Sequence, residues 1–180
     1  AAMLIHQGND AAAVPRLQRA IALADALSID KPDHYSILTG YGHYHQMLGE
    51  IALRSGDLAG ARRSLEAALK FRRGLVARDA KDVEAAINLA ATEAKLAVLN
   101  ERQGKAGATV RSEARARLKA LLQERPTSRR VQVAWVELLA DSPDCRERAE
   151  AQSTLDKLRT AYPELASLKR LRVQPCPTQG

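Results

Sequence analysis

The sequence predicts an all-α fold, built as a right-handed stack of antiparallel helical hairpins, and three observations favour it. The chain of 180 residues is 46% hydrophobic but only 3% aromatic. Ala and Leu dominate it, and such a composition favours helices over β-sandwiches. Glycine-containing turns recur at a fixed spacing. Between them, apolar residues recur every three or four positions, which is the period of an amphipathic helix.

The turns define an internal repeat with a period of 48 residues. Gly8, Gly56 and Gly104 are each separated from the next by 48 positions. Glycine suits the end of a helix, where the backbone needs a left-handed residue. We therefore expect each glycine to separate two antiparallel helices. Apolar positions follow the same offset, as in the pairs Leu17 and Leu65, Ile21 and Leu69, Leu48 and Leu96, and Ile51 and Leu99.

The elements follow from this repeat in chain order. The first seven residues have the pattern of a helix end, so we expect the chain to be part of a longer protein. Pro15 lies inside the next helix, where proline costs about 3 kcal/mol, and we expect that helix to start late or to distort. The other expected helices are 32–54, 58–78, 82–102, 109–124, 129–140, 144–161 and 164–172.

The predicted domain organisation is one repeat domain, 1–172, followed by an irregular tail, 173–180. The tail contains two prolines and no apolar periodicity. The repeat units within the domain are expected at about 8–55, 56–103, 104–140 and 141–172.

Part of the second unit resembles a tetratricopeptide repeat (TPR). Gly56-Asp57-Leu58 with Ala61, Leu65, Ala68 and Leu69 is similar to the second helix of that repeat, and Leu48-Gly49 matches the Leu-Gly pair of its first helix. The family period is about 34 residues, so the helices of this chain must be longer. The string Leu69–Asp79 also resembles the long repeats appended to bacterial serine/threonine kinases and other multidomain signalling proteins.

The resemblance covers roughly residues 8–163 and implies a TPR-like α-α superhelix. Proteins of this kind bind partner proteins or peptides in a concave groove lined by the first helix of each pair. It therefore implies a scaffold or sensor module of a larger bacterial signalling protein, such as a serine/threonine kinase. The family brings no catalytic residues to this segment.

Tyr41, Tyr44 and His45 are the candidate groove residues on the helix 32–54. Tyr and His offer rigid contact area with a polar tip, which suits a binding surface, although the same residues could pack in the core. His43 and His45 are two positions apart and point in different directions, so the sequence predicts no metal site. No phosphate-binding loop or catalytic triad is apparent, and no enzyme and no cofactor are expected.

The net charge of +7 is uneven, because residues 105–180 carry 15 basic and nine acidic residues. Arg111, Arg115 and Lys119 follow one helix face at four-residue steps. This face is either solvated or a docking surface for an acidic protein partner. The alternative functions are a nucleic-acid-binding helical repeat and a structural or dimerisation spacer. Nucleic acid is disfavoured because Trp135 is the one aromatic residue expected near the basic cluster, and its neighbours indicate a core position.

The two cysteines suggest a disulfide between Cys145, which opens a predicted helix, and Cys176 in the tail. The tail is long enough to return to Cys145. Such a bond would indicate an oxidising compartment such as the periplasm, whereas two free thiols would fit the cytoplasm. No membrane span is expected, since the chain lacks an apolar run of about 18 residues. No signal peptide is expected either, since the first residues show no charged region followed by a long apolar core. The oligomeric state stays open.

Overall fold

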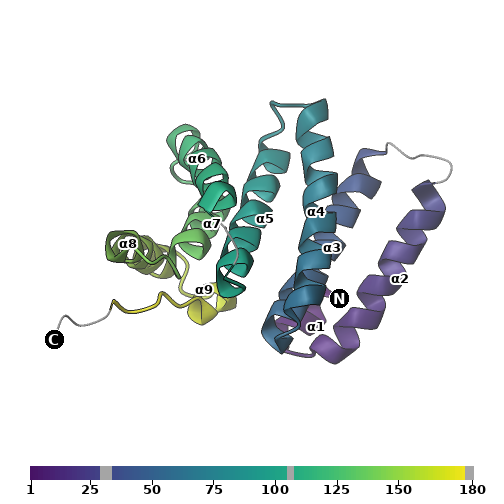
Figure 1. The fold of residues 1–180 in the computed structure, drawn as a ribbon, viewed down its shortest axis with the longest axis horizontal. Helices are drawn as coiled ribbons and strands as arrows, with labels where there is room; N and C mark the ends of the chain where they lie inside the picture. Colours follow the sequence, from purple (N-terminus) through teal and green to yellow (C-terminus); the bar gives the residue numbers. More distant parts are fainter. Residues whose placement is uncertain (29–33, 105–107, 177–180) are drawn as a thin grey trace. The chain divides into compact units, whose positions relative to one another are not determined.

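The computed structural model describes residues 1–28, 34–104 and 108–176. Within these ranges the fold is all-α without strands, and successive helices pack antiparallel (Figure 1). This confirms the predicted fold class at that level. The expected helix start at residue 32 and the tail beyond 176 lie outside the described residues. The helices are α1 (Ala2–His6), α2 (Asp10–Ser28), α3 (Tyr35–Ser55), α4 (Leu58–Arg78), α5 (Val83–Arg102), α6 (Ala108–Glu124), α7 (Arg129–Leu139), α8 (Cys145–Ala161) and α9 (Ala166–Arg170).

The chain divides into two compact units, Ala1–Thr92 and Glu93–Gly180. Helix α5 contributes its first part to one unit and its remainder to the other.

The three repeat glycines adopt the left-handed backbone conformation that their spacing predicted. The φ angles are 76° at Gly8, 82° at Gly56 and 64° at Gly104. Side-chain caps follow two of these turns: Asn9 Oδ1 accepts from the Ala12 amide at 3.1 Å, and Asp57 Oδ1 accepts from the Gly60 amide at 2.8 Å. Each cap satisfies an amide of the next helix that has no partner within it.

Helices α3 and α4 approach closely at Gly49, the glycine of the TPR-like Leu-Gly pair. A Cβ atom at Gly49 would lie 2.8 Å from Leu65 Cγ and 2.9 Å from its Cδ2. Leu65 is completely buried. The absence of a side chain at Gly49 therefore lets Leu65 pack directly against the backbone of α3.

Helices α1 and α2 pack on the second half of α3. Ala13 and Leu17 of α2 form a buried cluster with Ile51, and Leu4 and Ile5 of α1 pack against it. An ion pair also joins α3 to α2, because Arg54 donates to both carboxylate oxygens of Asp10, at 3.0 and 2.8 Å. Bidentate pairs of this kind are geometrically specific.

The expected late start of the helix around Pro15 was wrong. Helix α2 begins at Asp10 and continues through Pro15 to Ser28. The Asn9 cap anchors its first turn, and the packing of Ala13 and Leu17 against Ile51 favours the helical backbone on both sides of the proline.

Arg72 of α4 joins three helices of the first unit although it is only 4% exposed. Its guanidinium donates to the Asn88 carbonyl of α5 at 2.8 Å, and also to Gln46 Oε1 and Thr92 Oγ1. Gly42 leaves room for this side chain, because a Cβ there would lie 3.2 Å from Arg72 Cγ. The buried Arg72 guanidinium thus donates hydrogen bonds to neutral acceptors, and these bonds offset part of the cost of burying its charge.

The second unit packs the remainder of α5 with α6 to α9. Its fully buried leucines include Leu99, Leu118, Leu138 and Leu155. Trp135 is also buried, and it donates its indole N–H to Glu150 Oε1 of α8 at 2.9 Å. The interpretation of Trp135 as a core residue is confirmed, and this removes it as an exposed stacking platform.

Two glycine substitutions test the close packing of α3 on α4. Gly49→Ala should lower the free energy of unfolding by about 1–3 kcal/mol, because the new methyl group overlaps Leu65. Gly74→Ala in α4 is the matched control, since a Cβ there meets nothing within 4 Å. It should raise the free energy of unfolding by about 0.5–1 kcal/mol through helix propensity. Urea titrations followed by circular dichroism measure both. Equal effects of the two variants would contradict the close approach.

Candidate functional site

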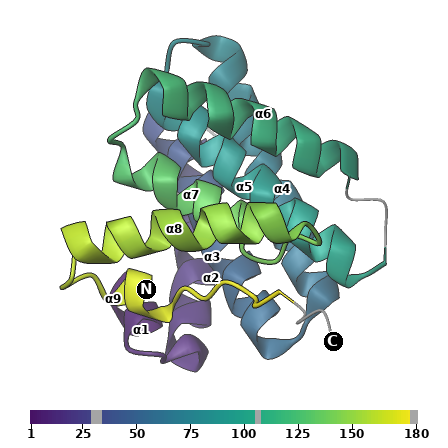
Figure 2. The same ribbon diagram turned by 90° about the vertical axis from the view of Figure 1, so that its left-hand side faces the viewer.

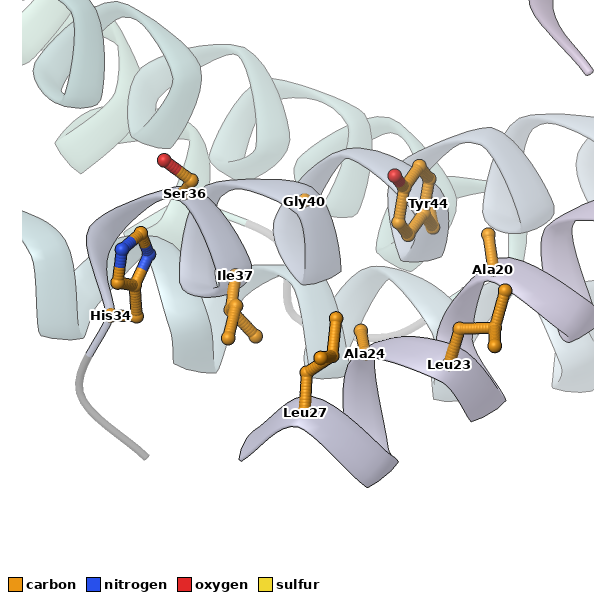
Figure 3. A pocket seen from close by; sticks show the side chains of 9 residues that line it. All are labelled: Ala20, Leu23, Ala24, Leu27, His34, Ser36, Ile37, Gly40 and Tyr44. Carbon is orange, nitrogen blue, oxygen red and sulfur yellow. The ribbon is translucent and has the colours of Figure 1, made fainter. Parts of the chain in front are cut away.

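The first unit has an open cavity between the second half of α2 and the first half of α3, with a volume of about 590 Å³ (Figure 3). Figure 3 shows the α2 side chains on one side and the α3 side chains on the other. We call it the α2–α3 groove. It is lined by Ala20, Leu23, Ala24, Leu27, His34, Ser36, Ile37, Gly40 and Tyr44.

The α2 wall of the groove is apolar and uncovered. Leu23 is 52% exposed and Leu27, one turn later, is 62% exposed. Ile37 faces them from α3. A single exposed leucine is ordinary on a protein surface, but adjoining apolar side chains around a cavity are typical of a binding site.

The α3 wall adds hydrogen-bonding groups without formal charge. The Tyr44 and Ser36 hydroxyls and the His34 ring offer hydrogen-bond donors and acceptors. Gly40 shapes the same wall, because a Cβ there would lie 3.4 Å from the Tyr44 ring. The described lining residues include no Asp, Glu, Lys or Arg. The groove therefore suits an apolar, uncharged surface with a few polar atoms.

The structure separates the three residues that the sequence grouped as a groove. Tyr44 lines the α2–α3 groove. Tyr41 is buried, donates its hydroxyl hydrogen to Asp25 Oδ1, and stacks on Phe71 of α4 with ring centroids 4.6 Å apart. His45 lies half-buried beside the same ring, at 6.1 Å. For Tyr41 and His45 the geometry matches the packing alternative.

The sequence interpretation missed Leu23, Leu27 and Ile37. A signal for the first two was present, since Leu23 and Leu27 are four residues apart on α2 and therefore share a face. Ile37 comes from another helix, and only the packing of α2 on α3 brings it to the same cavity.

The burial of His45 has an electrostatic consequence. Desolvation lowers the pKa of the His45 imidazole below its ordinary value, and the Asp25 carboxylate partly opposes this. The neutral ring is therefore the form that fits the stack with Tyr41 and Phe71.

The predicted basic face is partly neutralised by acids of the same unit. Arg111 donates to both carboxylate oxygens of Glu101, at 2.5 and 2.6 Å, and to the Leu138 carbonyl at 2.6 Å. Arg115 forms an ion pair with Glu147. Lys119 is exposed. Of the three candidate residues, Arg111 of α6 mainly stabilises the fold, because its hydrogen bonds connect α6 to α5 and α7. Recognition of an acidic partner stays a prediction.

Cys145 and Cys176 are paired as a disulfide in the structure, with Cα atoms 5.6 Å apart. That separation is in the ordinary range for a disulfide. Whether the protein carries the bond in solution stays a prediction, as does its compartment.

In the described ranges, no group of three or more His, Cys, Asp or Glu residues is arranged to hold a metal ion. No helix of that part of the chain is long and apolar enough to cross a membrane.

No known protein family, curated protein or solved structure matches this chain. The function must therefore be inferred from the geometry of its surfaces, because fold alone does not determine it.

The lowered pKa of His45 predicts a pH-dependent stability. Because the folded protein takes up the proton less readily than the unfolded chain, stability should fall as the pH drops below the ordinary histidine pKa of 6.5. His45→Gln should remove much of this dependence. Free energies of unfolding at about pH 7.5 and 5.5, on either side of that value, measure it.

The control is His34→Gln, which removes an exposed histidine and should keep the wild-type dependence. If the His45 variant lost as much stability on acidification as the wild type, burial of the ring would not control its protonation.

Proposed function

We propose that this chain is a protein- or peptide-binding helical scaffold, and that the α2–α3 groove receives an apolar face of the partner. The observation that carries the proposal is the uncharged apolar lining of an open cavity of about 590 Å³. Ligand pockets usually measure roughly 300–1,000 Å³. Leu23, Leu27 and Ile37 offer the contacts that an amphipathic helix needs when it lies in a groove.

The repeat supports the same class of function. Three left-handed glycines at a 48-residue spacing close successive helical hairpins, and stacked hairpins commonly present extended binding surfaces. The finer proposal is a TPR-like superhelix within a larger bacterial signalling protein, such as a serine/threonine kinase. It rests on the resemblance around Gly56 and Gly49. No catalytic role is proposed for this segment.

Selection from a random-peptide display library tests the proposal. The wild-type chain should enrich peptides with apolar residues at helical spacing. Leu23→Asp and Leu27→Asp each place a charge in the groove, and each should weaken binding of the selected peptides at least about tenfold, since burying an unpaired charge costs more than 1.4 kcal/mol. Both side chains are more than half exposed, so the fold should tolerate these changes. Titration calorimetry measures the affinities.

Met3→Asp is the matched control, because Met3 is 72% exposed and lies outside the groove lining. This variant should bind the selected peptides as the wild type does. Failure to enrich any peptide would contradict the proposal, and so would peptides that bind all three variants equally.

A further inference from the structure

The C-terminal segment 171–176 forms a strap that returns toward the start of α8. Figure 2 shows this segment running beside α8. Arg159 Nη2 of α8 donates to the Leu171 carbonyl at 2.8 Å, and the Gln174 amide donates to the Ala140 carbonyl at 3.0 Å. The Cys145–Cys176 disulfide closes the strap on the first residue of α8.

The two sulfurs are accessible but differ in their surroundings. Both cysteines are exposed. Arg148, one turn along α8, donates from Nη2 to Cys145 Sγ at 3.0 Å. The strap from Val173 to Cys176 contains no ionisable group other than the cysteine.

These surroundings favour negative charge on the Cys145 sulfur. A guanidinium and the first turn of a helix both stabilise a thiolate. The neighbouring Asp144 carboxylate opposes this effect, although the Arg146 amide binds it at 2.8 Å. The other acid of this turn, Glu147, is engaged by Ser142 and Arg115. Within 171–176 the cation is Arg172, whose guanidinium donates to the Lys169 and Leu171 carbonyls.

We propose that Cys176 is a reversible S-thiolation site whose partner sulfur, Cys145, is the built-in leaving group. The thiolate of a small thiol attacks Cys176 Sγ and forms a new S–S bond there. The Cys145–Cys176 bond breaks, and its electron pair leaves on Cys145 as a thiolate. In exchange reactions of this type the sulfur with the lower pKa leaves faster.

A second molecule of the small thiol completes the reduction. It attacks the thiol-derived sulfur of the mixed disulfide, and Cys176 leaves as a thiolate. The two small thiols are oxidised to one disulfide, while the protein gains two cysteine thiols. Breaking the disulfide releases the Cys176 end of the strap from α8. The hydrogen bond from the Gln174 amide to the Ala140 carbonyl then holds this part of the strap. This reaction goes beyond the proposed binding function and is independent of it.

The test uses the full chain and glutathione as the small thiol. The intact mass of the non-reduced protein should first fall short of the fully reduced mass by two hydrogens. A brief incubation with glutathione, quenched with iodoacetamide, should then leave glutathione mainly on Cys176 and carbamidomethyl mainly on Cys145. Trypsin separates the two cysteines into peptides 131–146 and 173–180. We expect at least about a threefold excess of the Cys176 adduct, because the sulfur whose thiolate is better stabilised leaves faster.

Variants of Arg148 test the cause of the preference. Arg148→Gln should reduce the excess toward equal labelling, whereas Arg148→Lys, which keeps the positive charge, should retain most of it. The Gln174 amide should exchange its hydrogen faster once the bond is opened. The proposal would be overturned by free thiols in the oxidised preparation, by an adduct that favours Cys145 or neither sulfur, or by a preference unchanged in Arg148→Gln.

Discussion

The left-handed glycine turn is the constraint on which the architecture of this chain depends. At Gly8, Gly56 and Gly104 a Cβ atom would meet nothing within 4 Å. Glycine is therefore required at these positions by the backbone conformation, not by crowding. Each of these turns ends one helix and directs the chain into the next. The apolar stripes of the two helices on either side of Gly56 can then face each other, which is how Leu65 of α4 comes to Gly49 of α3.

The α2–α3 groove follows from where small residues meet in this arrangement. The second half of α3 is closely covered, by α4 at Gly49 and by α2 at Ile51. Further along the pair, Ala20 and Ala24 of α2 face Gly40 of α3. These side chains are too short to fill the space between two helix axes, which lie about 8–10 Å apart in ordinary packing. The longer Leu23 and Leu27 side chains border the cavity. The groove therefore exists because the short side chains of α2 and α3 leave the space between the two helices unfilled.

The sequence predicted the helices well because local signals determine them. The expected helix 58–78 coincides with α4, and 82–102 differs from α5 by one residue. Pro15 was misjudged because the propensity scale does not include the tertiary packing around Ala13 and Leu17. Local patterns fix where a helix starts and stops, whereas neighbouring helices decide whether an unfavourable residue is tolerated.

The candidate sites were less predictable, because they depend on contacts between helices. Periodicity placed Tyr41, Tyr44 and His45 on one helix but could not show that Phe71 of α4 covers two of them. Charge spacing found Arg111 but not its partner Glu101, which lies on a different helix. The proximity of Cys145 and Cys176, with Cα atoms 5.6 Å apart, could be expected from chain length and two cysteines alone, whereas the bond in solution stays a prediction.

We propose above that the α2–α3 groove is the docking surface for an apolar partner helix. It is tested most directly by amide chemical shifts of the ¹⁵N-labelled chain during titration with an amphipathic peptide that carries leucines at helical spacing. Docking in the groove should give saturable shifts concentrated at Leu23 and Leu27 of α2 and at Ile37 and Tyr44 of α3. Shifts centred on Arg115 and Lys119 instead, or no saturable shifts at all, would contradict it.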